Sequence, residues 1–396
     1  MRKLALLASV TALTAVVGLH SSSQAADDEI VIGFAIAQSG WMNAYDGPPA
    51  KAAEMAIEDI NAKGGVLGKK LRAVFSDTKS EQTEGAKAGQ EVISNGAQFM
   101  VVSCDYDMGA AAATVANDNK IVVIATCASD AKMGVQGIGP YAFTMSNSSL
   151  TSGAVIAEWA YTKKNWRNAY TLLDTTIEYD KAICGGFKAR WEKLGGKLVG
   201  EDTFKQDDAS IASQITRIKQ AGKIDLLHVC SYGGGGVSTI KQIRAAGIDT
   251  PISGGDSMDG DYWTKGVGKL NDHYTGTYGS VFKDDPRPEI NEFFDRYEKK
   301  YGERVCCSFA VTGYSVIQAI ALAVERAKST DSDKVLAEFN KFNGEKFLVG
   351  PTKYSEELHI NLERPQAIIG IKDGKGYMVE LIQLPEPPPL QLIFKK

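Results

Sequence analysis

Hydroxyl and carboxyl side chains follow several of the short apolar segments of this chain. Ser103 and Asp105 come just after the apolar residues 99–102, and Asp256 comes just after residues 251–253. Such groups donate and accept hydrogen bonds, and the carboxylates can also pair with a cation. Because no catalytic base stands out beside them, the chemistry that they indicate is the binding of a small polar molecule.

Motifs of the common hydrolases are missing from the sequence. The chain has four histidines, and it contains neither HExxH nor GxSxG. Gly255-Asp256-Ser257-Met258 is similar to the opening block of GDS-type esterases, but no DxxH follows it. We therefore expect a protein that is not an enzyme and has no catalytic residue, cofactor or metal site, with an exported GDS-type hydrolase as the alternative.

Strand and helix patterns alternate along most of the chain, which predicts an α/β fold with parallel sheets. Strands are expected at residues 30–36, 71–75, 99–102, 121–124, 169–173, 198–199, 226–229, 251–253, 274–281, 366–371 and 376–382. Helices are expected at residues 50–62, 81–94, 109–117, 152–163, 183–193, 210–220, 237–245, 289–299 and 311–327.

The first 25 residues have the pattern of a signal peptide. Arg2 and Lys3 precede an apolar run at 4–19, and Ser23-Gln24-Ala25 is a small-residue cleavage site. The run is shorter than a membrane span needs, so we expect cleavage near Ala25 and export to the periplasm of a protein that is not inserted in the membrane.

Length and net charge further limit the number of domains and the kinds of partner that we expect for this protein. The 396 residues are too many for one ordinary core and favour two domains. The net charge is −4 and would be −6 without Arg2 and Lys3. Since no basic run is interleaved with aromatic residues, nucleic acid is not expected as a partner.

Residues 30–71, IVIGFAIAQSGWMNAYDGPPAKAAEMAIEDINAKGGVLGKKL, carry a resemblance to a known family. An apolar strand, a loop with two aromatic residues and an amphipathic helix that ends at Gly64-Gly65 follow one another. This stretch resembles the first motif of the type I periplasmic binding proteins, in the branched-chain amino acid (Leu/Ile/Val) binding family.

The resemblance implies two doubly wound α/β lobes joined by a three-strand hinge. The crossings between the lobes would fall near residues 142–147, 274–280 and 348–354. One lobe would then comprise residues 26–145 plus 276–352, and the other 146–275 plus 353–396. The ligand cleft of the family lies between the lobes, at the carboxyl ends of strands from both.

The loops of the first lobe would supply one wall of that cleft. Tyr45 matches an aromatic position that faces the ligand, and Trp41 lies in the same loop; both could instead pack on a neighbouring helix. Asp105 stands where the amino acid binders have a serine for the ligand carboxylate. An ionised aspartate cannot donate that hydrogen bond, so Ser103 is an alternative donor and Asp105 could simply cap the next helix. Phe309 would form the floor or belong to the core.

A second polar group comes from residues 125–130. Ala128 and Ser129 match the alanine-threonine pair that binds the ligand's carboxylate and ammonium in the family. A backbone N–H there would also favour an anion, because it would lie at a helix N-terminus. A plain serine cap is compatible with this role.

The second lobe would contribute Tyr179, Tyr232 and Asp256. Tyr179 matches a tyrosine just before a helix, and Tyr232 would close over the ligand. The four glycines 233–236 let the backbone approach closely, and a phosphate cradle there is disfavoured because GxGxxG and GK[ST] are absent. Asp256 matches the acidic residue that pairs with the ligand ammonium, although an aspartate at a strand end is often only a helix cap.

Six cysteines lie in the exported part, where disulfides are permitted. Cys104 and Cys127 end neighbouring strands, Cys184 and Cys230 belong to the second lobe, and Cys306 and Cys307 are adjacent. Both first pairs are candidates for bridges, but the sequence does not choose among the pairings, and free buried thiols remain an alternative.

The resemblance implies amino-acid transport as the function. The chain would be the periplasmic substrate-binding component of an ABC importer, a monomer that closes on an amino acid or a related amide or aromatic acid. It would deliver that solute to the permease subunits of the inner membrane. A soluble ligand-sensing relay for a membrane receptor is a further alternative.

Overall fold

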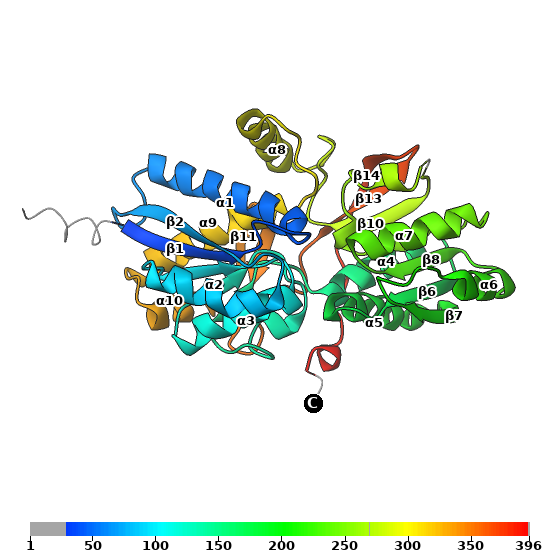
Figure 1. The fold of residues 1–396 in the computed structure, drawn as a ribbon, viewed down its shortest axis with the longest axis horizontal. Coiled ribbons are helices and arrows are strands. Elements are labelled where there is room, and N and C mark those ends of the chain that lie inside the picture. Colours follow the sequence, from blue (N-terminus) through cyan, green and yellow to red (C-terminus); the bar gives the residue numbers. More distant parts are fainter. Residues whose placement is uncertain (1–28, 269, 395–396) are drawn as a thin grey trace, which may run out of the picture.

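Two α/β lobes lie side by side in the protein, and the segments that join them run between the two (Figure 1). This computed structural model describes residues 29–268 and 270–394, so the predicted signal peptide lies outside the described residues. Each lobe is built on its own largely parallel sheet. The predicted fold class is therefore confirmed.

Five parallel strands form the sheet of the first lobe, in the order β2-β1-β3-β4-β5. They are β1 (Glu29–Ile36), β2 (Lys70–Asp77), β3 (Phe99–Val102), β4 (Val123–Ala125) and β5 (Ala142–Thr144). The central strand β3 is apolar and buried throughout, because helices cover both faces of the sheet.

Two different cores flank this sheet. Phe99 and Val101 face one core with α1 (Asn43–Ala62) and α9 (Ala310–Ala327). Met100 and Val102 face the other, with α2 (Gln82–Ser94) and α3 (Tyr106–Asp118). Alternate residues of a strand point to opposite faces, and this period places the carboxyl end of β3 between the layers.

Seven strands form the sheet of the second lobe, in the order β14-β13-β10-β9-β8-β6-β7. The five parallel strands are β6 (Asn168–Asp174), β7 (Lys197–Phe204), β8 (Leu226–Cys230), β9 (Ile252–Gly254) and β10 (His273–Thr277). The remaining two, β13 (Gln366–Lys372) and β14 (Lys375–Ile382), are antiparallel.

Helices cover both faces of this second sheet as well. The aromatic core on one face includes side chains of α4 (Ser149–Thr162) and α5 (Glu178–Lys193). The opposite face carries α6 (Ala212–Gln220) and α7 (Gly233–Ala245). A Cβ on Gly153 would come 2.1 Å from the Ile183 carbonyl oxygen, so α4 and α5 touch backbone to backbone. This close contact fixes the start of α5 beside the cleft.

Several elements differ from the sequence-based expectations. Helix α1 begins at Asn43 rather than at residue 50, because Pro48 and Pro49 fall in its first turns and do not end it. Helix α10 (Ser332–Phe339) and the hairpin β11 (Asn343–Phe347) with β12 (Gly350–Lys353) were not predicted. Helix α8 (Pro288–Tyr301) lies close to its predicted range.

The chain passes between the lobes after β5, after β10 and after β12. Arg364, only 3% exposed, ties two of these passages together. Its guanidinium donates to the carbonyl oxygens of Met145 (2.8 Å) and Pro351 (3.0 Å) and to the Thr352 hydroxyl (2.8 Å). Burial lowers the pKa of Arg364 to about 10. One buried cation therefore satisfies polar groups from two of the three connections.

Two disulfides connect elements near the cleft. Cys104–Cys127 joins the loops after β3 and β4, and Cys184–Cys230 joins α5 to β8. Cys306 and Cys307 are not in disulfides. In the part of the chain that the structure describes, no helix is long and apolar enough to cross a membrane.

Candidate functional site

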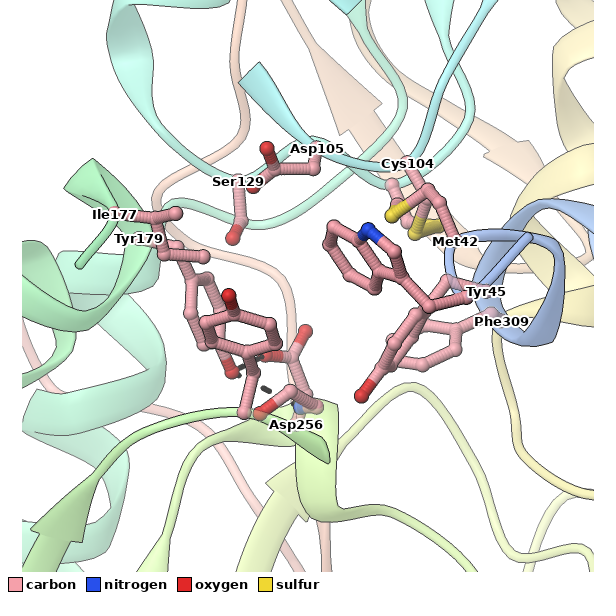
Figure 2. A pocket seen from close by; sticks show the side chains of 13 residues that line it. Met42, Tyr45, Cys104, Asp105, Ser129, Ile177, Tyr179, Asp256 and Phe309 are labelled. Atoms are coloured by element: carbon pink, nitrogen blue, oxygen red, sulfur yellow. Dashed lines mark hydrogen bonds between the residues drawn. A yellow bond between two sulfur atoms is a disulfide. The ribbon is translucent and has the colours of Figure 1, made fainter. Parts of the chain in front are cut away.

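A pocket lies between the two lobes, with about 370 Å³ of space among its lining atoms, part of it open to solvent (Figure 2). Its wall draws on loops that follow β1, β3 and β4 in the first lobe and β6, β8 and β9 in the second. The lining residues are Trp41, Met42, Tyr45, Cys104, Asp105, Cys127, Ser129, Ile177, Tyr179, Tyr232, Asp256, Ser257 and Phe309.

Most of the residues singled out from the sequence line this pocket. The structure brings together Trp41, Tyr45, Asp105, Ser129, Tyr179, Tyr232, Asp256 and Phe309. Two others lie behind the wall: the Ser103 hydroxyl donates to Asp46, and the Ala128 carbonyl accepts a hydrogen bond from the Thr144 hydroxyl. Met42, Cys104, Cys127, Ile177 and Ser257 line the pocket without having been predicted.

Asp105 both caps a helix and faces the pocket. Its Oδ1 accepts a hydrogen bond from Met108 N (3.1 Å) at the start of α3. The carboxyl group is at the same time part of the pocket wall (Figure 2). Burial, and then the nearby charge of Asp107, raise the pKa of Asp105 to about 7. The two roles considered from the sequence are thus compatible.

Asp46 supports the same wall from beneath and was not predicted. Its carboxylate accepts hydrogen bonds from Ala37 N (2.8 Å), Cys104 N (2.7 Å) and the Ser103 hydroxyl (3.1 Å). These bonds tie the loop after β1 to the loop after β3. Burial raises the pKa of Asp46 to about 6, although the three donors act in the opposite direction. Asp46 stands in an Asp-Gly-Pro-Pro sequence that indicates a turn, so no pattern revealed this role.

Ser129 links the first lobe to the start of the second. Its hydroxyl lies 2.6 Å from the hydroxyl of Ser149, the first residue of α4. The Ser149 N–H also donates to the Ser129 carbonyl (2.8 Å). The hydroxyl therefore has a protein partner and still forms part of the pocket wall.

A hydrogen-bonded set from the second lobe faces these groups. The Tyr179 hydroxyl donates to Asp256 Oδ1 (2.6 Å) and accepts from Ser257 N (2.9 Å), as the dashed lines in Figure 2 show. Burial raises the pKa of Asp256. The Ser257 hydroxyl donates to the Ser231 carbonyl (3.0 Å) and not to a base. This arrangement gives no support to Ser257 as a nucleophile.

Aromatic rings from both lobes close the pocket. The Trp41 ring lies 5.5 Å from that of Tyr232 in the opposite lobe, and Tyr45 lies 5.9 Å from Phe309. Trp41 is 44% exposed, so its ring stands at the mouth. A Cβ on Gly233 would come 2.7 Å from the Tyr45 hydroxyl, which shows how closely the glycine-containing turn approaches the first lobe.

Comparisons with known proteins agree with this geometry. A family model described as periplasmic binding protein matches residues 29–375. Leu/Ile/Val-binding protein homolog 3 of Brucella melitensis is 25% identical over 84% of this chain and 88% of its own length. The leucine-, isoleucine-, valine-, threonine- and alanine-binding protein of Pseudomonas aeruginosa is 24% identical over 83% of this chain and 86% of its own length.

Solved structures show the same fold. The branched-chain amino acid transporter substrate-binding protein LivJ of Streptococcus pneumoniae, in complex with isoleucine, has a TM-score of 0.78 at 24% identity and covers 90% of this chain and all of its own. A solute-binding protein of Rhodopseudomonas palustris in complex with 3,4-dihydroxybenzoic acid has a TM-score of 0.75 at 22% identity, over 91% of this chain and 99% of its own. The predicted resemblance is confirmed, and the chain belongs to the periplasmic binding protein family, in the type I group that includes the branched-chain amino acid binders.

Proposed function

We propose that this protein captures one small organic solute between its lobes by hinge closure and delivers it to the permease of an ABC importer. The observation that carries the proposal is a pocket whose wall is shared by both lobes, with Asp105 and Ser129 on one side and Tyr179 and Asp256 on the other. A solute that touches both walls binds the closed form better than an open one, and therefore shifts the population towards closure.

Each lobe would move as a unit during closure. The units are residues 26–145 plus 276–352 and residues 146–275 plus 353–396, joined by the three connections near Arg364. The polar head of the solute would contact Asp105 and Ser129, and Ser103 and Ala128 would hold that wall in place. Tyr45, Tyr179 and Tyr232 would pack on its body, with Trp41 at the mouth and Phe309 at the floor.

Solved structures of similar proteins contain organic solutes, but the solutes differ, so they do not identify the solute of this protein. The Streptococcus pneumoniae and Rhodopseudomonas palustris structures were solved with isoleucine and with 3,4-dihydroxybenzoic acid. An amino acid or a related amide or aromatic acid is therefore the class that we propose for this pocket. Asp256 would face a positively charged group of the solute. Export to the periplasm, cleavage near Ala25, action as a monomer and docking on the permease subunits belong to the same proposal.

Isothermal titration calorimetry of the exported protein against amino acids, amides, amines and aromatic acids tests this function. Trp41→Ala in the first lobe and Tyr232→Ala in the second should each weaken binding about 10- to 100-fold, because each removes an aromatic ring from the pocket wall. Tyr377→Ala on β14, outside the pocket, is the matched control and should bind as the unchanged protein does. The proposal is wrong if no solute of these classes binds, or if only one of the two substitutions weakens binding.

A further inference from the structure

Cys306 and Cys307 are the two cysteines of this chain that are not in disulfides. They are adjacent in the sequence, and their sulfur atoms lie 2.8 Å apart. Cys307 is 1% exposed, whereas Cys306 is partly exposed. Burial raises the pKa of the Cys307 thiol well above its usual value. A thiol that reagents in solution can reach therefore touches a second thiol that is buried and protonated.

The adjacency of the two residues makes a bridge between them easy to reverse. Most disulfides join residues whose Cα atoms are about 4.4–6.8 Å apart, whereas neighbouring residues are about 3.8 Å apart across a trans peptide bond. A disulfide between neighbours is therefore strained and is reduced more easily than an ordinary one. Cys306 and Cys307 are thus the pair of this chain that can change between two redox states.

The segment that carries the cysteine pair contacts the opposite lobe. It lies just before α9 of the first lobe, and a Cβ on Gly260 of the second lobe would come 2.0 Å from the Cys306 carbonyl oxygen. Ser308 N donates to Asp259 Oδ2 (2.5 Å), and Asp259 is fully buried. The backbone on both sides of the pair is therefore part of the contact between the lobes.

The same segment leads directly into the pocket wall. Phe309 follows Ser308 and lines the pocket, with its ring 5.9 Å from that of Tyr45. Cys306 Sγ lies 4.0 Å from the Ala44 carbonyl oxygen near the start of α1. A change in the backbone at residues 306–308 would therefore reach both the lobe contact and the pocket wall.

We propose that Cys306 and Cys307 are a redox modification site, in which a reversible disulfide between them breaks the hydrogen bond from Ser308 N to Asp259 and weakens the contact between the lobes. The disulfide would close a small ring that includes the 306–307 peptide group. Because this ring holds both Cβ atoms close together, the backbone torsions of both residues must change. The site operates whether or not the protein binds a solute.

Thiol–disulfide exchange with a small-molecule disulfide supplies the oxidation. Cys306 Sγ loses its proton to water, attacks one sulfur of that molecule and releases the other as a thiolate, which takes up a proton. Cys307 Sγ then attacks Cys306 Sγ in the mixed disulfide, and the proton of Cys307 passes to the second departing sulfur. The two protein thiols are oxidised to one disulfide, and the external disulfide is reduced to two thiols.

Oxidised glutathione, added to the protein without its predicted signal peptide, tests the redox step. The peptide that spans both cysteines should lose two hydrogen atoms by mass spectrometry, and the reactive thiols should fall from two to none. Dithiothreitol should restore both thiols at a concentration that leaves the other two disulfides intact. Cys306→Ser is the matched control, because it cannot form the bridge and keeps the buried Cys307.

Hydrogen exchange of the Ser308 amide tests the effect on the lobe contact. The exchange should be about 10- to 100-fold faster in the oxidised protein, because a buried hydrogen bond to a carboxylate is lost. In Cys306→Ser, glutathione treatment should leave the rate unchanged. The Asn168 amide, which donates to Asp225 within the second lobe (3.0 Å), should exchange equally fast in both redox states.

Each other outcome overturns the proposal. Thiols that remain reduced, a mixed disulfide that stays on Cys306, or a dimer linked through Cys306 would show that the pair does not form the bridge. A bridge that forms without faster exchange of the Ser308 amide would show that oxidation does not act on the lobe contact. None of these results depends on which solute binds in the pocket.

Discussion

At the scale of single residues, burial is the main influence on the pKa values of the carboxyl groups at this site. Asp46, Asp105 and Asp256 are all buried, and burial is the largest cause of the raised pKa of each. A raised folded-state pKa means that the folded protein holds protons which the unfolded chain has already lost. Each of these groups therefore stabilises the fold less as the pH rises.

Asp105→Asn isolates this effect at one position. The pKa of Asp105 is raised from 3.8 to about 7, so the unchanged protein should lose stability between pH 4 and 7 as this group ionises in the fold. Asparagine caps helices as well as aspartate does but cannot ionise. The free energy of unfolding of the variant, minus that of the unchanged protein, should increase by roughly 2–4 kcal/mol from pH 4 to pH 7.

Urea unfolding at a series of pH values without solute measures that difference. Asp118→Asn, at the other end of α3, is the control and should show a nearly constant difference over the same range. A constant difference in Asp105→Asn as well would mean that Asp105 ionises as freely in the folded protein as in the unfolded chain.

Position after a strand was sufficient to predict some of the residues that line the pocket. Tyr232 and Asp256 each follow an apolar strand, and the carboxyl ends of parallel strands meet at one edge of a sheet. Ser103 also follows a strand, but its hydroxyl turns towards Asp46 instead of the pocket. Asp46 was missed because nothing in a sequence distinguishes a buried aspartate from one on the surface.

At the scale of elements, apolar runs and hydrophobic periodicity predicted most strands and helices but missed helix α10 and the β11–β12 hairpin. Strand β3 was predicted at its observed bounds, because four consecutive apolar residues fill it. Helix α10 has eight residues, and its capping aspartate, Asp331, was the one local signal for its start. Both disulfides of the structure, Cys104–Cys127 and Cys184–Cys230, were candidates from the sequence, which could not choose among the pairings because pairing depends on which elements meet.

The connections between the lobes depend on Arg364. Methionine in its place has a similar length but donates no hydrogen bond, so the carbonyls of Met145 and Pro351 would lose their buried donor. Arg364→Met should lower the free energy of unfolding by about 3–5 kcal/mol. Arg326→Met, which removes an exposed ion pair with Glu345, should change it by about 1 kcal/mol or less.

Denaturant unfolding of Arg364→Met and Arg326→Met measures the change in the free energy of unfolding that each substitution causes. Equal effects of the two substitutions would show that the buried hydrogen bonds of Arg364 contribute no more than a surface ion pair. That result would contradict a hinge held together by one buried guanidinium.

For the whole molecule, direct polar contacts join the lobes, and some of them are buried. Ser308 N donates to Asp259 Oδ2 (2.5 Å), and the Ser129 and Ser149 hydroxyls lie 2.6 Å apart. Asp107 accepts from Glu178 N, and Lys132 and Arg304 form exposed ion pairs with Glu178 and Asp261 across the cleft. Exposed pairs contribute little free energy. In the proposed closure, a solute would add contacts to those that already join the lobes, and the rings of Trp41 and Tyr232 lie 5.5 Å apart across the pocket.

Lobe closure around a shared solute is the central claim, and small-angle X-ray scattering of the protein without its predicted signal peptide tests it most directly. The radius of gyration should decrease when a solute identified by calorimetry is added to saturation, and it should decrease less at the same concentration in Tyr232→Ala. An unchanged radius of gyration at saturation would show that binding does not bring the lobes together, and it would contradict the account.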